Sequence, residues 1–140
     1  MNMQVKLAER TEELKLICPT LLQLRPQYSE ETLIAQIQSQ QKDGYRIAYV
    51  EDGGNVLSVA GFVQGQKLAW QKHIYVDDLV TDEAHRSSGA GRLLIAWLKE
   101  FGRSHGCQQL HLDSGAHRFY LREGFDITSH HFAVVDLDAD

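Results

Sequence analysis

The chain has few of the residues that cross-link a small protein or mark an unusual class of chain. Only two of its 140 residues are cysteine and two are proline, and no apolar run approaches the length of a membrane span. Cys18 and Cys107 lie far apart in sequence and fit no metal-ligand spacing. With no signal peptide apparent before them, we expect free thiols in a reducing compartment. The expected protein is therefore cytoplasmic, binds no metal and crosses no membrane.

An excess of positive charge is also missing. The formal net charge is −5, which argues against a general affinity for nucleic acid or an anionic membrane surface. A cationic or amine-bearing partner fits this charge better. Hydrophobic residues make up 43% of the chain and charged residues 24%, as in ordinary globular proteins. We therefore expect one domain over residues 1–140, large enough to bury a core without cross-links.

Hydrophobic periodicity and turn residues predict an α/β fold with a mixed sheet and the element order β-α-α-β-β-β-α-β-α-β-β. The expected strands are residues 3–8, 45–51, 56–63, 70–81 and 108–112, and a β-rich tail follows over 125–137. The expected helices begin near Leu14 (interrupted at Pro19), at the N-cap Ser29 and at Gly89, and the last covers residues 116–123. Residues 70–113 form a βαβ unit, which predicts two parallel strands joined by a right-handed crossover.

The turn between the strand at 70–81 and the next helix carries the strongest functional signal. Residues 86–92 read Arg-Ser-Ser-Gly-Ala-Gly-Arg, and the first turn of the helix contains no acidic residue. Helix starts normally attract Asp or Glu, because their unpaired N–H groups carry partial positive charge. A start that lacks its own anion, and is flanked by Arg86 and Arg92, is suited to bind a phosphate group from outside.

Two common phosphate loops do not fit this turn. A dinucleotide fingerprint needs a third glycine and an acid about 20 residues further on, and neither stands in the expected place after Gly91. A P-loop needs Gly-Lys-Ser or Gly-Lys-Thr, which the chain lacks. The pattern that remains is Arg-x-x-Gly-x-Gly between a strand and an amphipathic helix.

This pattern resembles the acyl-CoA signature of the GCN5-related N-acetyltransferase (GNAT) superfamily. Residues 86–91 match the signature, residues 78–81 match the family's central strand, and residues 116–125 match its late helix, which usually ends in Tyr-x-x-x-Gly-Phe. The resemblance implies a single GNAT-like domain whose mostly antiparallel sheet contains one splayed parallel strand pair. It also implies transfer of an acetyl group from acetyl-CoA to a primary amine of a small molecule or protein by direct attack.

The resemblance further implies where the co-substrate acetyl-CoA binds. Backbone N–H groups of the turn would hold the pyrophosphate, and the exposed end of the central strand would pair with the pantetheine arm. An N–H near Leu79 would polarise the thioester carbonyl. The expected cofactor-binding residues are Leu79, Val80, Thr81, Arg86, Ser87, Ser88, Gly89, Ala90, Gly91 and Arg92.

Two side chains are candidates for proton transfer. Tyr120 matches the residue that protonates the CoA sulfur in many relatives, although a tyrosine at such a position also serves as ordinary packing. Asp78, directly before Leu79, is our choice for the base that takes a proton from the amine, and ideal strand alternation puts Asp77 on the opposite face. The alternatives for both acids are solvation of a sheet end or binding of the acceptor's charge, with a water chain as the base.

The chain departs from the family pattern in one place. Only Asp113-Ser114-Gly115 separates the late strand from the following helix, where many relatives have a longer connection with an Asn that contacts the pantetheine arm. This leaves open whether Tyr120 reaches the sulfur. Three functions therefore remain: an N-acetyltransferase, a non-catalytic acyl-CoA-binding sensor or partner module, and another phosphate-binding α/β domain. The acceptor, and homodimerisation through the tail, stay undetermined.

Overall fold

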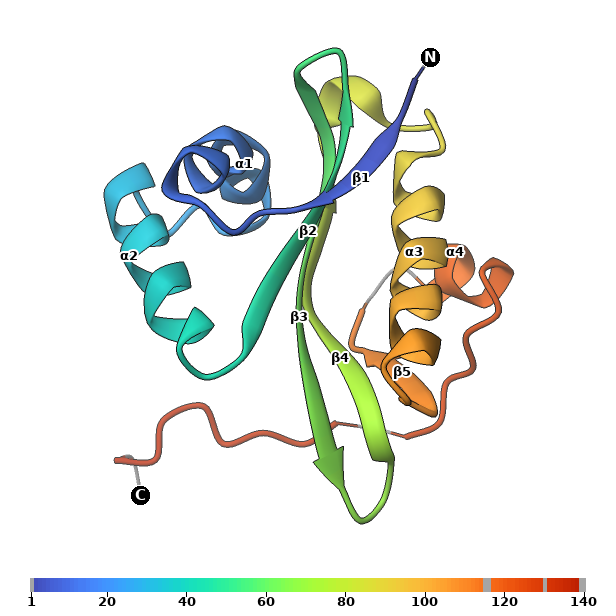
Figure 1. Ribbon diagram of the computed structural model, residues 1–140. Coiled ribbons are helices and arrows are strands. Elements are labelled where there is room, and N and C mark those ends of the chain that lie inside the picture. The colour runs from blue at the N-terminus through green and yellow to red at the C-terminus, as the bar shows by residue number, and fades with distance from the viewer. Residues whose placement is uncertain (1, 115–116, 130, 139–140) are drawn as a thin grey trace.

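In the computed structural model, the chain forms a five-stranded sheet with helices on both faces (Figure 1). The structure describes residues 2–114, 117–129 and 131–138. The strands lie in chain order: β1 (Gln4–Leu7), β2 (Tyr45–Asp52), β3 (Asn55–Lys67), β4 (Gln71–Thr81) and β5 (Gln109–Leu112). Neighbouring strands are antiparallel except β4 and β5, which are parallel. The predicted mixed, mostly antiparallel sheet with one parallel pair is confirmed.

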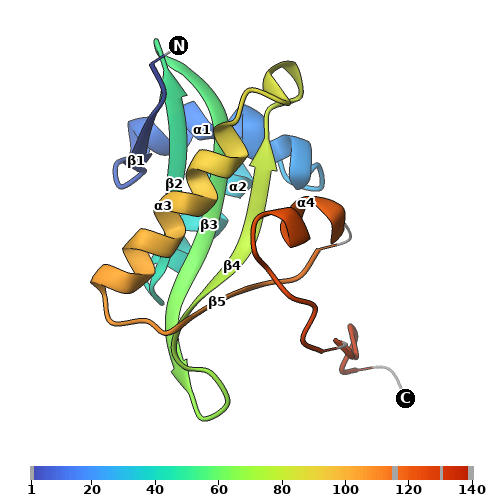
Figure 2. The same cartoon turned by 90° about the vertical axis from the view of Figure 1, so that its right-hand side faces the viewer.

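The helices divide between the two faces of the sheet. α1 (Thr11–Leu24) and α2 (Glu30–Gln41) cover one face, and α3 (Ala90–Ser104) covers the other with α4 (His117–Arg122) beside it (Figures 1 and 2). A short 3₁₀ helix, η1 (Glu83–His85), connects β4 to α3. Ser29 caps α2 as predicted, because its Oγ accepts a hydrogen bond from the Thr32 amide at 3.1 Å. None of the described helices is long and apolar enough to cross a membrane.

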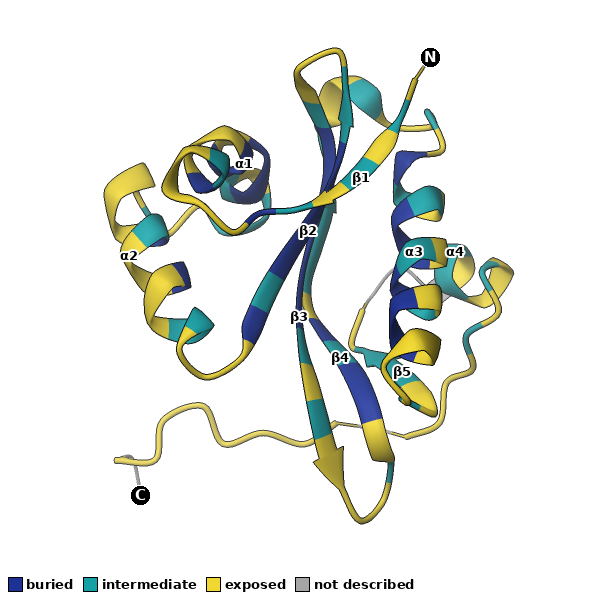
Figure 3. Ribbon diagram, viewed as in Figure 1, coloured by how far each residue is buried: buried dark blue, intermediate teal, exposed yellow. Residues whose placement is uncertain are grey.

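Two hydrophobic clusters lie between the sheet and its helices. Figure 3 shows buried residues, in dark blue, along the middle strands and on the sides of α1 and α3 that face the sheet. On the face of α1 and α2, Ile17 and Leu21 pack against residues such as Tyr49 and Val59. On the other face, the apolar stripe of α3 packs against strand residues, which include Phe62 and Ile74. The middle strands read as nearly continuous apolar runs because both of their faces are buried.

The predicted interruption at Pro19 is wrong. α1 continues through Pro19. The proline has no N–H to donate to the helical hydrogen-bond pattern, but the helix does not end there. Cys18, Thr20 and Leu21 beside it are buried, and Cys18 and Leu21 belong to the core on this face of the sheet. Tertiary packing therefore outweighs the local preference of proline.

The element order agrees with the prediction through α4, but the tail does not continue it. Described residues 125–129 and 131–138 form no strand, although a β-rich tail was expected over 125–137. A strand is stable only when it pairs with a neighbour and buries one face. The tail's apolar side chains find no such face, because most of them are exposed: Ile127, Phe132, Val134, Val135 and Leu137. Ala116, where the last helix was expected to begin, lies outside the described residues.

Candidate functional site

The sheet is interrupted where β4 carries one extra residue. Val76 pairs with Phe62 on β3 and Asp78 pairs with Gly61, so Asp77 is left without a partner, as in a β-bulge. Pairing between β4 and β5 ends at the same level, with Val76 opposite Leu112. Beyond this level β3 still pairs with residues 78–81, but on the β5 side no described strand pairs with residues 77–81. The expected splay of the parallel pair therefore begins at the bulge.

Because Asp77 is the extra residue of the bulge, ideal strand alternation no longer decides the faces of Asp77 and Asp78. Asp78 lies on the face of α1 and α2, where its carboxylate accepts hydrogen bonds from Tyr45 Oη at 2.6 Å and from Arg25 Nε at 2.8 Å. The charge of Asp77 contributes to the raised pKa values of Tyr45 and Tyr75. Burial and the Asp78 carboxylate raise the pKa of Asp77, and the Arg25 guanidinium opposes this.

The turn that follows β4 is braced by a single carboxylate. Asp82 accepts hydrogen bonds from Gln23 Nε2 at 2.7 Å and from the Ala84 amide at 3.1 Å, and the His85 ring nitrogen Nδ1 lies 2.8 Å away. The Gln23 and His85 contacts lower the pKa of Asp82. Gln23 belongs to α1, so its hydrogen bond to Asp82 connects the turn to a helix on the sheet face opposite α3.

The start of α3 has the geometry expected of an anion-binding turn. Ser87 and Gly89 both have left-handed backbone conformations, with φ angles of 67° and 88°. The first turn of α3 contains no acidic residue. Arg86 and Arg92 are exposed, and Arg92 Nε lies 3.8 Å from Glu123 Oε1. A helix start without an acid of its own, with two exposed arginines close by in the chain, is suited to bind an anion.

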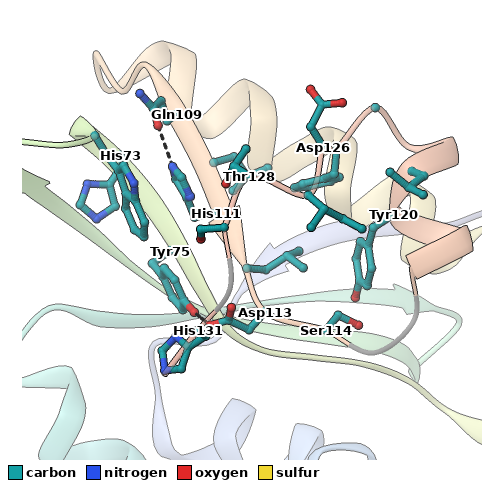
Figure 4. A pocket seen from close by; sticks show the side chains of 18 of the residues that line it. His73, Tyr75, Gln109, His111, Asp113, Ser114, Tyr120, Asp126, Thr128 and His131 are labelled. Atoms are coloured by element: carbon teal, nitrogen blue, oxygen red, sulfur yellow. Dashed lines mark hydrogen bonds and ion pairs between the residues drawn. The ribbon is translucent and has the colours of Figure 1, made fainter. Parts of the chain in front are cut away.

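Tyr120 lies on α4, which packs beside α3. Lys99 of α3 donates a hydrogen bond from Nζ to the backbone oxygen of Glu123 at 2.6 Å, just after α4. The Tyr120 ring meets Phe125 edge-on, with 5.6 Å between the ring centroids. Burial raises the pKa of Tyr120, and a hydrogen bond with Ser114 lowers it. Figure 4 shows the hydroxyl turned toward Ser114. The phenol is therefore protonated at neutral pH and available as a donor.

A cavity of about 1390 Å³ opens between β5 and the tail, and Tyr120 lies at its edge (Figure 4). Tyr75 and Asp113 also line it and are hydrogen-bonded to each other, and His131 Nδ1 lies 3.7 Å from Asp113 Oδ2. Burial and the Asp113 carboxylate raise the pKa of Tyr75 to about 12. The space exceeds what a drug-sized molecule needs.

His111 and Trp70 form the aromatic wall of this cavity. Their rings are stacked, with 3.5 Å between the centroids, and Lys67 Nζ lies 3.2 Å from the Trp70 ring centre. His111 Nε2 is 2.7 Å from Gln109 Oε1, a carbonyl oxygen that only accepts, so this nitrogen donates. Burial, His73 and Lys67 lower the pKa of His111, and Asp113 opposes them. The imidazole is therefore neutral at neutral pH.

The structure brings only part of the predicted site together. Residues 79–81 connect to the turn at 86–92 through η1. Gly91 lies between β4 and α4, since a Cβ there would be 3.2 Å from Thr81 Oγ1 and 3.8 Å from Phe119 Cζ. Of the two predicted proton-transfer residues, Tyr120 lines the cavity and Asp78 does not. Gly115, in the short connection before α4, lies outside the described residues. Among the residues that the structure describes, no cluster of His, Cys, Asp and Glu could hold a metal ion.

Sequence reasoning missed Arg25, Tyr45 and Gln23. All three act over long sequence separations, so no local pattern marks them. One signal was present: Gly61 stands inside a strand, and such a glycine often marks a bulge or a close approach.

Comparison with known proteins identifies the fold and the family. The sequence model of the acetyltransferase (GNAT) family matches residues 9–125. An uncharacterized N-acetyltransferase of Bacillus subtilis (strain 168), YhdJ, is 28% identical over 121 residues, which cover 81% of this chain and 85% of that protein. The aminoglycoside N-acetyltransferase AAC(6′)-Iy, solved in complex with CoA, superimposes with a TM-score of 0.85 at 15% identity, covering 97% of this chain and 95% of that one. For the glucosamine-6-phosphate N-acetyltransferase of Arabidopsis thaliana the TM-score is 0.76 at 19% identity, over 97% and 100%.

Proposed function

We propose that this chain acetylates a primary amine of a small molecule or a protein by direct attack. It belongs to the acetyltransferase (GNAT) family and is an acetyl-CoA-dependent N-acetyltransferase. The observation that carries this proposal is the end of β4–β5 pairing at the Asp77 bulge, shortly before the acid-free start of α3. One stretch of chain thereby offers an unpaired strand edge for the pantetheine arm of acetyl-CoA and a turn for its pyrophosphate.

The donor site follows from this arrangement. Backbone N–H groups of Ser88 to Gly91 hold the pyrophosphate, and Arg86 and Arg92 add charge. The pantetheine arm pairs with the edge of residues 79–81, in the way that an extended peptide adds to a sheet. The N–H of Leu79 then points toward the thioester carbonyl and stabilises the oxyanion that forms there.

The chemical step moves one acetyl group and two protons. The amine nitrogen attacks the thioester carbon, which gives a tetrahedral oxyanion. When this intermediate collapses, the C=O bond re-forms, the C–S bond breaks, and the CoA thiolate takes a proton from Tyr120. A phenol with a raised pKa releases its proton only as the thiolate develops, since a thiol has a reference pKa of about 8.5.

The base that deprotonates the amine is one of the two acids at the bulge. That Asp78 does so stays a prediction, and both of its oxygens already accept hydrogen bonds. Asp77 has a raised pKa, so it is the better proton acceptor of the pair. Turnover of Asp77→Asn and Asp78→Asn against pH distinguishes them: only loss of the base removes the acidic limb of the profile.

Two measurements test the proposed function. Acetyl-CoA should raise the melting temperature, because ligand binding to the folded state stabilises it by mass action. Release of CoA thiol is then measured across a panel of amines, including amino acids, polyamines, aminoglycosides and peptides. No thermal shift at millimolar acetyl-CoA rules out both an enzyme and a binder. A shift without thiol release favours the alternative, a non-catalytic acyl-CoA-binding module, which the short connection before α4 makes a real competitor.

The role of Tyr120 has its own test. Tyr120→Phe keeps the ring against Phe125 but removes the proton, so turnover should fall by about 10²-fold with little change in acetyl-CoA affinity. Tyr28→Phe, on the loop between α1 and α2, is the matched control. An unchanged rate in Tyr120→Phe would show that the tyrosine only packs.

A further inference from the structure

Arg25, the residue directly after α1, joins that helix to the bulge of β4. Its Nε donates to Asp78 Oδ1 at 2.8 Å, and its Nη2 donates to the backbone oxygen of Asp77 at 3.2 Å. One guanidinium therefore holds a side chain and a main-chain group of the two residues at the bulge. The fixed fork of donors on arginine suits this double contact, which a lysine ammonium does not reproduce.

Tyr45, the first residue of β2, holds Asp78 from the other side. Its hydroxyl donates to Asp78 Oδ2 at 2.6 Å, and the residue is only 4% exposed. The hydroxyl passes across Gly61, where a Cβ would lie 1.7 Å from the Tyr45 oxygen. Because Gly61 is the β3 partner of Asp78, the glycine makes room for Tyr45 at the level of the bulge.

The contacts of Arg25 and Tyr45 hold the backbone of β4 at the level where its pairing with β3 is interrupted. A bulge leaves its extra residue unpaired, so its backbone direction has to be fixed by something other than strand pairing. The Asp78 side chain is 14% exposed, which shields its two charge-assisted hydrogen bonds from solvent. Leu79, the next residue, is the one whose N–H was assigned to the thioester carbonyl.

We propose that Arg25, Asp78 and Tyr45 form a clamp that fixes the backbone of the β4 bulge and so positions the N–H of Leu79 for acyl transfer. This inference rests on the function proposed above. Arg25 and Tyr45 are positioning residues, because they act through Asp78 and the bulge and not on the acetyl group. The pyrophosphate turn lies outside the clamp, so loss of the clamp should lower turnover far more than acetyl-CoA affinity.

The test compares clamp variants with matched controls on the same elements. Tyr45→Phe removes only the hydroxyl, and Tyr49→Phe makes the same change at another buried tyrosine of β2, whose hydroxyl contacts Glu13 at 3.2 Å. Arg25→Gln removes the charge at the end of α1, and Arg10→Gln does so at its start. Arg25→Lys restores the charge but not the second bond, and should recover part of the activity.

Two readouts are needed, kinetics and amide hydrogen exchange of residues 76–81. Since a misplacement of about 1 Å can cost about 10²-fold in rate, kcat should fall 10- to 100-fold in Tyr45→Phe and Arg25→Gln. KM for acetyl-CoA should stay within about threefold, and exchange at 76–81 should accelerate about tenfold, with neither change in the controls.

Each outcome decides a separate question. Equal losses of kcat in clamp and control variants, or unchanged exchange at 76–81, overturn the clamp. Accelerated exchange in the clamp variants, in a protein that shows no turnover with any amine, supports the fixing of the bulge by the clamp. It overturns the proposed function and, with it, the positioning of the Leu79 N–H for acyl transfer.

Discussion

Replacing Gly61 with alanine tests the packing beneath the β4 bulge. The new Cβ would lie 1.7 Å from the Tyr45 hydroxyl oxygen and 2.4 Å from its Cζ. Ordinary contact between heavy atoms begins near 3.5 Å, so the Tyr45 ring has to move by roughly 1.5 Å or more. Such a movement separates the hydroxyl from Asp78, to which it now donates at 2.6 Å.

The expected cost follows from these two effects. Forcing an extra methyl group into a packed core costs about 1–3 kcal/mol, and losing a hydrogen bond to a charged group costs about 1.5–3 kcal/mol. The free energy of unfolding should therefore fall by about 2.5–6 kcal/mol. In a chain of this length each kcal/mol corresponds to roughly 3 °C, so the melting temperature should fall by about 8 °C or more.

Urea unfolding and calorimetry of four variants check this reasoning. Gly102→Ala is the control, because a Cβ there would lie 3.4 Å from Ile74 Cγ1 in ordinary contact, and alanine in a helix should stabilise by about 0.5–1 kcal/mol. In a Tyr45→Ala background, Gly61→Ala should cost less than about 1 kcal/mol, since the obstructing ring is gone. A cost that is small in the parent chain, or equally large without the ring, would refute the steric argument.

Three further predictions concern the turn before α3. The contacts of Asp82 lower its pKa. The stability that Asp82 contributes is therefore complete above its unfolded pKa of about 3.9, and it is lost as pH falls through the lower pKa of the folded state. In urea unfolding, Asp82→Asn should be less stable than the parent at pH 7, and this difference should shrink toward pH 3. Ser87→Gly should raise the melting temperature by about 3 °C in calorimetry, because a left-handed φ of 67° costs a non-glycine residue roughly 1 kcal/mol. Arg86→Ala should weaken acetyl-CoA binding about tenfold at low salt and less at high salt in titration calorimetry, while Arg103→Ala, an exposed arginine near the other end of α3, should not.

Local pattern was sufficient for most of the fold. The expected strands at residues 45–51 and 56–63 correspond to β2 and β3, and the N-cap Ser29 marks the start of α2 as the structure has it. Pro19 was misread because a proline's local preference says nothing about the packing on either side of it. The tail was misread because its apolar residues have the composition of a strand, whereas a strand also requires a partner edge.

The candidate site divides along the same line. The turn at residues 86–92 could be recognised because glycines, arginines and a missing acid all lie within one short window. The relation of Asp77 to Asp78 could not, since strand alternation assumes a regular ladder and fails wherever a residue is inserted. No feature of residues 70–81 alone reports that insertion, and the register with β3 decides it.

The residues that hold the bulge come from four separate parts of the chain, and this distribution indicates a functional role for the bulge. Arg25 follows α1, Tyr45 begins β2, Gly61 lies in β3 and Asp78 lies in β4. A regular ladder would be the more stable local arrangement, because it pairs every backbone group and needs neither a buried tyrosine hydroxyl nor a glycine in mid-strand. Side chains from distant parts of the chain instead hold the sheet in its interrupted form, at the level where β5 leaves β4. Such a concentration of specific contacts around a break in pairing is expected where the exposed backbone is itself used, as binding of an acyl arm along residues 79–81 requires.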